Sequence, residues 1–295
     1  MAHIIAIVNQ KGGVGKTTVC RTLSTMLHES NYKCLLIDFD PQQTLSLSLG
    51  VVKNRFDEDT PSMYHVLNNE MSIKDAIIHT EQFDFVRSDY RMYSYNGTPL
   101  ISREKALELR NNPAALYSHV IENLDLQSNP NTDDRHKLRR ELDKISSEYD
   151  FIIIDTNPDL GALSSLVFLS SSTTNILIPA FPEESSRQSV IALHNTIQTI
   201  LANDLSQRIN ILGILISRFE KNNISKKYLT YFKRLANNMN TTLFNSLIPK
   251  SVLVSESMAL KQSLFDRRKK APIIDEYRAF YKEFLQKIKQ LEEGN

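Results

Sequence analysis

Short unbroken runs of apolar residues alternate along the chain with segments whose apolar residues recur every three or four positions. Unbroken runs are typical of strands buried on both faces of a parallel sheet. They predict strands at residues 3–9, 33–40, 83–88, 149–156, 173–180, 209–217 and 242–249. Helical spacing predicts helices at 15–30, 134–148, 160–171, 184–203, 223–239 and 272–292. This alternation predicts an α/β fold of three layers, in which helices cover both faces of a mainly parallel sheet.

The whole chain, residues 1–295, is expected to form one domain. Its composition, 41% hydrophobic and 23% charged, is ordinary for a globular protein. The segment at about 89–133 departs from the alternation, because it is polar and has turn signals around a helical stretch near 101–124. We interpret it as a helical insertion. It would serve either as a partner-docking or dimer-flanking surface or as a tolerated surface insertion.

The stretch IIAIVNQKGGVGKTT, residues 4–18, joins the first predicted strand to the first predicted helix. A phosphate-binding loop of the pattern G-x-x-x-x-G-K-[ST] would start with glycine at position 10. Here Gln10 occupies that position and a second lysine, Lys11, follows it. The strand, the glycines and the helix nevertheless occur in the order that a phosphate site requires. The backbone N–H groups expected to surround the phosphate belong to Gly12, Gly13, Val14, Gly15 and Lys16.

Side chains of this loop and of two strand ends predict the rest of the site. Lys16 is expected to reach the β- and γ-phosphates, Thr17 to ligate Mg²⁺, and Thr18 to approach the α-phosphate. Asp155 ends the strand FIIIDT and is expected to hold the same metal ion. Asp38 and Asp40 end the second strand. Asp40 lies nearer the ligand crevice, so we assign it to the attacking water, whereas Asp38 supports the loop.

The charge distribution predicts which partners the protein could bind, and the cysteine content predicts whether it contains disulfides. The net charge is only +1, but residues 218–270 hold twelve Lys and Arg against three acids, a local +9 that leaves −8 elsewhere. This asymmetry predicts either a basic face for a polyanion or a merely solvated surface. Cys20 and Cys34 form no disulfide framework and are expected to be reduced and buried. Neither a signal peptide nor a membrane-spanning run is visible in the sequence.

Five ordered segments resemble the deviant Walker A ATPases of the ParA/MinD class. They are KGGVGKTT at 11–18, DFDPQ at 38–42, FIIIDTNPDLG at 151–161, IPAFPEE at 178–184 and LIPKSVLVSESMALKQSLFD at 247–266. The resemblance implies a P-loop NTPase fold, ATP and Mg²⁺ as cofactors, and slow ATP hydrolysis that a partner stimulates.

The resemblance also implies a role for each matching residue. Lys11 corresponds to the signature lysine, which reaches into the phosphate site of a second ATP-bound subunit and offsets the charge of two facing triphosphates. Lys16 corresponds to the phosphate lysine, and Thr17 to the metal ligand. Asp40 and Asp155 correspond to the switch I and switch II aspartates, which we place with Thr17 around the metal ion.

The sequence departs from the family pattern at two positions. Asn157 replaces the first proline of D-x-P-P, which is expected to alter the stiffness of the switch. Lys250 replaces an arginine, which keeps the charge and loses the bidentate fork. The residues expected near adenine are Ser217, Arg218 and Pro249.

A ParA-type DNA partition ATPase is the function we predict. It would form a homodimer in the ATP state, bind DNA non-specifically in the cytoplasm on the nucleoid, and be released by a centromere-binding ParB-type partner. The predicted DNA contacts are Lys250, Lys261, Arg267, Arg268, Lys269 and Lys270, with support from Lys226, Lys227, Lys233 and Arg234. Phosphate contacts of this kind give affinity without reading the base sequence.

Three alternatives stay open at this point. A MinD-like regulator of division would need a basic amphipathic C-terminal helix, but residues 275–293 hold five acids and four bases. We therefore expect the apolar stripe of that helix to pack on the chain's own sheet, with no membrane contact. An iron–sulfur reductase would need cysteines away from the phosphate loop. A metabolic kinase or amidoligase would need a substrate pocket that no motif marks.

Overall fold

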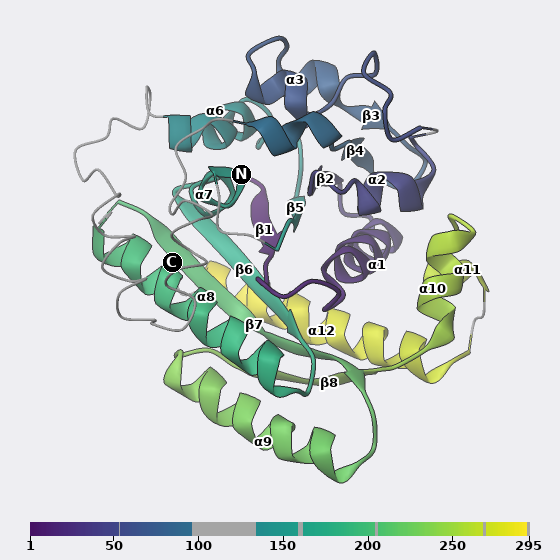
Figure 1. Cartoon of the computed structure of the whole chain (residues 1–295), viewed down its shortest axis with the longest axis vertical. Coiled ribbons are helices and arrows are strands. Elements are labelled where there is room, and N and C mark those ends of the chain that lie inside the picture. The colour runs from purple at the N-terminus through teal and green to yellow at the C-terminus, as the bar shows by residue number, and fades with distance from the viewer. Residues whose placement is uncertain (53, 96–133, 159–161, 204–205, 268–269, 294–295) are drawn as a thin grey trace.

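The computed structural model describes residues 1–52, 54–95, 134–158, 162–203, 206–267 and 270–293, and its centre is an eight-stranded sheet (Figure 1). The strand order is β3-β4-β2-β5-β1-β6-β7-β8, and only the pairing of β3 with β4 is antiparallel. The strands are β1 His3–Ile7, β2 Cys34–Phe39, β3 Ile78–His79, β4 Asp84–Val86, β5 Phe151–Thr156, β6 Thr173–Ala180, β7 Arg208–Phe219 and β8 Leu243–Pro249.

Helices cover both faces of this sheet, so the predicted three-layer α/β fold is confirmed. The α-helices are α1 Lys16–Glu29, α2 Thr44–Leu49, α3 Met63–Leu67, α6 Lys137–Asp143, α7 Ala162–Phe168, α8 Glu184–Asn203, α9 Asn223–Asn238, α10 Val252–Ala259, α11 Leu264–Arg267 and α12 Pro272–Glu293. In the described part of the chain, three 3-10 turns accompany them: η1 Ile73–Ala76, η2 Tyr90–Ser94 and η3 Asp134–His136.

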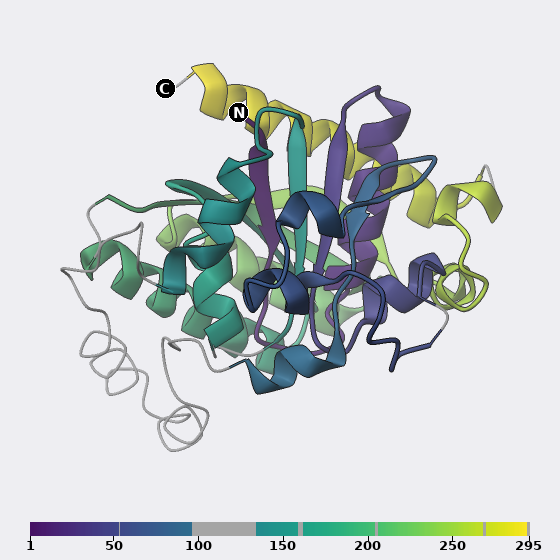
Figure 2. The ribbon, with the colours of Figure 1, turned by 90° about the horizontal axis from the view of Figure 1, so that it is seen from above.

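Two hydrophobic cores, one on each face, hold the layers together. Helices α6, α7, α8 and α9 pack on one face, whereas α1, α10 and α12 pack on the other. In Figure 2 the yellow α12 lies on the same side of the strands as the purple α1. Every residue of β2 and β5 is buried, which explains why their sequences are apolar without alternation.

The apolar stripe of α12 packs against the chain itself, as the charge count of this helix predicted. Ile274, Tyr277, Phe284 and Ile288 are buried in the core shared with α1 and β8, and Tyr281 and Leu291 pack against its edge. Each fully buried large side chain contributes about 1.5–3 kcal/mol relative to an exposed one. Among the described residues, no helix is long and apolar enough to cross a membrane.

The predictions failed at short elements. The two-residue strand β3 and the helices α2, α3, α10 and α11 were not predicted, and the helix expected at 134–148 covers only Lys137–Asp143 after the turn η3. Of the predicted insertion at about 89–133, residues 96–133 lie outside the described residues, so the helical stretch near 101–124 stays a prediction.

Gly213 marks an irregularity where β7 pairs with β6. The register shifts by one residue between Ile176 and Leu177, which face Ile211 and Gly213 respectively. A β-carbon at Gly213 would lie 2.6 Å from the Phe244 ring and 3.0 Å from the carbonyl oxygen of Thr242. Glycine is therefore required by the close approach of β8.

We expect Gly213→Ala to lower the free energy of unfolding by about 1–3 kcal/mol, because the added methyl group must displace a packed ring. Urea denaturation of the nucleotide-free protein measures this. Gly12→Ala is the control, since a β-carbon there meets no atom within 4 Å. Equal midpoints for both variants would contradict the packing argument.

Candidate functional site

The loop between β1 and α1 has the geometry of an anion cradle. Gly13 and Gly15 have φ angles of 76° and 94°, in the left-handed region that favours glycine. Gly15 directly precedes the first residue of α1, Lys16. The unpaired N–H groups at the start of this helix therefore face the space that the loop encloses. Gly12, Gly13, Gly15, Lys16, Thr17 and Thr18 all line a cavity of about 1060 Å³.

Lys16 is buried inside this loop. Its ammonium group donates to the carbonyl oxygens of Asn9 at 3.1 Å and Lys11 at 3.5 Å. Burial lowers the pKa of Lys16, while the charges of Asp155 and Asp40 act to raise it. The lysine is thus held among carboxylates and loop carbonyls, at the place from which it could reach a phosphate.

Asp38 and Asp155 are paired residues on the neighbouring strands β2 and β5. Asp38 accepts hydrogen bonds from the Ser46 backbone N–H at 2.8 Å, the Ser46 hydroxyl at 2.6 Å and the Asp40 N–H at 3.1 Å. These hydrogen bonds hold the backbone of residues 40–46, which follows β2. Asp38 therefore acts as a support, and Asp40, half-buried beyond the strand, lines the cavity.

Asp155 is fully buried, and within the described part of the chain neither of its carboxylate oxygens has a hydrogen bond of normal geometry. Burial raises its pKa, while the nearby Thr17 hydroxyl and the charge of Lys16 act to lower it. Burial also raises the pKa of Asp38, and the charge of Asp155 adds to that effect. A buried carboxylate without a partner is costly, so this one is suited to a proton or a cation.

The donor set fits magnesium held partly by a nucleotide. Among the described residues, no three His, Cys, Asp or Glu side chains gather closely enough to hold a metal ion by themselves. Asp155 and the Thr17 hydroxyl offer two oxygen ligands, and Asp40 lines the same cavity. Mg²⁺ typically uses one or two carboxylates together with phosphate oxygens and water.

The residues predicted near adenine line the same cavity as the phosphate loop. Ser217, Arg218 and Pro249 all line it. The Ser217 hydroxyl donates to the Val14 carbonyl at 2.8 Å, so this side chain also ties β7 to the phosphate loop. The guanidinium of Arg218 lies 4.6 Å from the ring centre of Phe181.

Several residues of this region were missed by the sequence analysis. Phe181 and Glu183 belong to the segment IPAFPEE, whose resemblance to the family was noted without a role for either residue. Val252, Met258 and Tyr277 line the cavity from α10 and α12. No local pattern in the sequence marks them, because they reach the cavity only through tertiary packing.

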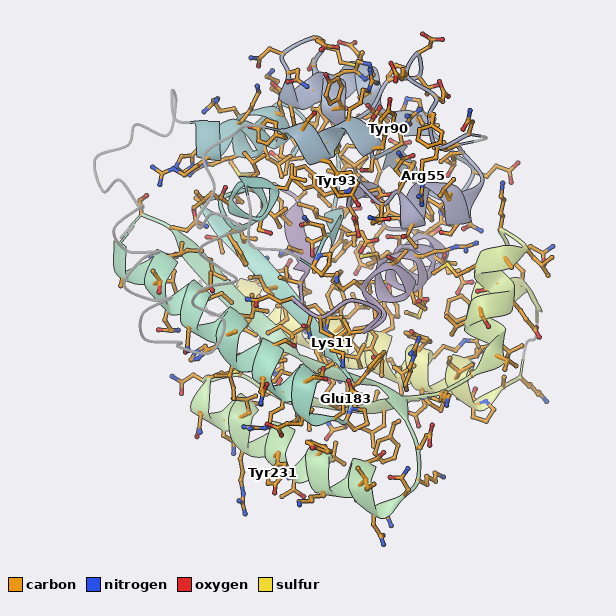
Figure 3. The ribbon with its side chains drawn as sticks, viewed as in Figure 1. Lys11, Arg55, Tyr90, Tyr93, Glu183 and Tyr231 are labelled. Atoms are coloured by element: carbon orange, nitrogen blue, oxygen red, sulfur yellow. The ribbon has the colours of Figure 1, made fainter. Side chains whose placement is uncertain are left out.

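The side chain of Lys11 does not point away from the protein, as we expected of a residue that reaches a second subunit. It forms an ion pair with Glu183 and donates to the Ser185 hydroxyl at the start of α8 (Figure 3). In the single chain, the half-buried Lys11 ammonium group thus has a carboxylate partner within its own subunit. Its role across a dimer interface stays a prediction.

Only some of the residues predicted to contact DNA lie in the described part of the chain. Arg268, Lys269 and the side chain of Arg267 lie outside the described residues. Lys250 forms an ion pair with Glu220 at 3.2 Å, and Lys261 and Lys270 are exposed. On α9, four cations are exposed and have no carboxylate partner in the described part of the chain: Lys226, Lys227, Lys233 and Arg234.

The chain is similar to known proteins over most of its length. A family model described as an AAA domain matches residues 2–211. The chromosome partitioning protein ParA of Myxococcus xanthus is 28% identical over 262 residues, which cover 87% of this chain and 78% of that protein.

Two solved structures share the fold. Apo McdA from Cyanothece has a TM-score of 0.73 at 20% identity, covering 97% of this chain and all of that one. Cobyrinic acid a,c-diamide synthase from Mycobacterium smegmatis, with bound ADP and magnesium, has a TM-score of 0.70 at 21% identity, covering 98% of this chain and 96% of that one.

The raised pKa values of Asp38 and Asp155 predict how stability depends on pH without nucleotide or metal. Each carboxyl holds its proton more tightly in the folded state, so the free energy of unfolding falls as the pH rises from about 5 to 8. Asp155→Asn removes one of these groups and the charge that raises the pKa of the other. We expect this variant to show a flatter pH dependence and to be more stable than the wild type at pH 8 by about 1–3 kcal/mol.

Denaturation in urea with EDTA, across this pH range, measures the effect. The exposed Asp59→Asn is the matched control and should retain the slope of the wild type. Parallel curves for Asp155→Asn and the wild type would show that Asp155 does not hold a proton in the folded protein.

Proposed function

The chain belongs to the AAA domain family, and we propose that it is an ATP-hydrolysing partition protein of the ParA type. It would bind ATP with Mg²⁺, dimerise face to face, hold DNA without sequence preference, and release it when a ParB-type partner stimulates hydrolysis. One observation carries this proposal: a phosphate loop with a second lysine brings Lys16 and Thr17 next to Asp155, a buried carboxylate with no hydrogen bond of normal geometry among the described residues. The likeness to the chromosome partitioning protein ParA supports it.

Different residues of the cavity would contact the phosphates, the base and the metal ion. The loop N–H groups and Lys16 would hold the phosphates, and Arg218, Phe181 and Pro249 would enclose the base. Asp155 and Thr17 would hold Mg²⁺, which supplies charge neutralisation on the phosphates when bound. This binding would add a second counter-charge to that of Lys16 beside the buried carboxylate.

Asp40 is the side chain suited to orient the attacking water. It lies beyond the end of β2, and its carboxylate accepts the Gln42 N–H at 2.9 Å, which fixes the residue at the cavity wall. Asp38 holds the preceding backbone through Asp40 and Ser46. A positioned carboxylate of this kind acts on the water in phosphoryl transfer.

The outer side of α9 is the surface that we propose for DNA. Its inner side packs in the core through Phe232 and Ala236. Its exposed side carries Tyr231 (Figure 3) and four cations that have no carboxylate partner among the described residues: Lys226, Lys227, Lys233 and Arg234. Lys250, by contrast, already has Glu220 as a partner. Several exposed cations on one helix suit a phosphate backbone, and the Lys227 ammonium also lies over the Tyr231 ring, 5.8 Å from its centre. DNA binding would place the protein on the nucleoid.

The MinD-like alternative finds less support in the structure. Its membrane contact would need an exposed apolar face on the last helix. In α12 that face is buried against α1 and β8. The partition function is therefore the one that the described surfaces favour.

Two substitutions separate binding from hydrolysis. Lys16→Ala should weaken ATP binding by about 100-fold or more, because the loop loses its phosphate cation. Asp40→Ala should bind ATP normally and hydrolyse it about 100-fold more slowly. Calorimetric titration and phosphate release measure the two quantities. Normal hydrolysis by Asp40→Ala would reassign the attacking water to another residue.

DNA binding tests the function itself. Anisotropy of a labelled duplex of arbitrary sequence, with ATP, ADP or no nucleotide at two salt concentrations, should show tight, salt-sensitive binding only with ATP. Replacing Lys226, Lys227, Lys233 and Arg234 by alanine should weaken binding at least about tenfold and reduce the salt slope. Lys282→Ala, an exposed lysine on α12, is the control. No binding with ATP would refute the partition function, and normal binding by the α9 variant would refute this surface.

A further inference from the structure

Lys11 is held by its own subunit at the start of α8. Its ammonium group pairs with the Glu183 carboxylate and donates to the Ser185 hydroxyl. The Ser185 hydroxyl donates in turn to Glu183 at 2.9 Å, which orients the carboxylate. Figure 3 shows Lys11 directed at Glu183. The three side chains form one closed set of polar contacts, which we call the Lys11 latch.

The backbone beneath the latch is fixed by a buried residue. The Asn9 side chain accepts the Lys11 N–H at 2.9 Å and the Ser189 hydroxyl at 2.8 Å, and it donates to the Pro179 carbonyl at 2.7 Å. Asn9 is fully buried. The loop and the start of α8 therefore form one unit, in which Lys11 reaches Glu183 without moving the backbone.

The two lysines of the loop are connected. The Lys16 ammonium donates to the carbonyl oxygen of Lys11 itself, at 3.5 Å. A phosphate in the cradle would compete for that ammonium group, because a charged acceptor is stronger than a peptide carbonyl. Binding of nucleotide would thus remove one of the contacts that hold the Lys11 segment.

We propose that Glu183, assisted by Ser185, is an autoinhibitory partner of Lys11 and sets the protein concentration at which the ATP dimer forms. This inference rests on the proposed function, in which Lys11 crosses to the phosphate site of a second subunit. One ammonium group cannot occupy both positions, so each latch must open before the dimer closes. The contact raises the dissociation constant of the dimer and keeps the subunits apart at low concentration.

The exposure of the pair limits the size of this effect. Lys11 is 26% exposed and Glu183 46% exposed, so the contact is a partly solvated ion pair. Such a pair favours the closed state by about two- to fivefold. Because both subunits must open, the factors multiply, and the dissociation constant should change by about 4- to 25-fold.

Dimer formation tests the proposal in the presence of ATP and Mg²⁺. Sedimentation of Asp40→Ala protein, in which hydrolysis is impaired, gives the concentration at which half of the chains are dimeric. Adding Glu183→Gln should lower this midpoint by about 4- to 25-fold. Glu184→Gln is the matched control, since its carboxylate pairs with Arg187 and not with Lys11. An unchanged or raised midpoint with Glu183→Gln overturns the proposal, whereas a failure of every variant to dimerise overturns the proposed function instead.

A double-mutant cycle tests the latch without nucleotide. Lys11→Met and Glu183→Gln, alone and combined, are compared by urea denaturation of the full chain. The pair should show a coupling equivalent to about a two- to fivefold change in the unfolding equilibrium. Glu184→Gln combined with Lys11→Met should show none. Additive effects of Lys11→Met and Glu183→Gln would mean that the latch is not formed in the free protein, and would overturn the proposal.

Discussion

The burial of charge at one edge of the sheet is the constraint on which the rest of this structure depends. Parallel strands end together, so Asp38 and Asp155 become neighbours at the carboxyl ends of β2 and β5. A buried carboxylate without a partner is unfavourable, and it must be neutralised by a proton, a lysine or a metal ion. The phosphate loop brings Lys16 and Thr17 to this edge. Lys16 and the Thr17 hydroxyl therefore offset part of the charge that is buried there.

The two lysines of the loop, Lys11 and Lys16, lie in different surroundings and therefore have different roles. Lys16 is enclosed, and its surroundings are carboxylates and loop carbonyls. Lys11 lies outside the cradle, and its carboxylate partner, Glu183, directly precedes α8. Asn9 connects the two environments, because it accepts Lys16 through its backbone and Lys11 through its side chain. A change at the phosphate position can therefore reach the first turn of α8 through very few bonds.

The two faces of the sheet serve different purposes. On one face, α12 covers α1 and β8 with aromatic and aliphatic side chains, and its apolar stripe is buried against the chain itself. On the other face, α9 buries one side and presents cations on the other. A surface of one charge sign attracts a polyanion from a distance, and salt screens that attraction. Hydrophobic burial thus positions the charged surface and the ATP site on one rigid frame.

The sequence by itself determined the long elements and which polar residues stand at their ends. Seven strands and the positions of Lys16, Thr17, Asp40 and Asp155 were predicted because unbroken apolar runs and loop motifs are local signals. Helices of one or two turns, such as α2 and α11, were missed because so short a helix depends on tertiary packing rather than on its own pattern. Only the tertiary structure decided that Lys11 meets Glu183, that Asp155 is buried beside Lys16 and Thr17, and that Phe181 joins Arg218. These are contacts between segments far apart in the chain, and no spacing along a sequence encodes which ends of a folded sheet come together.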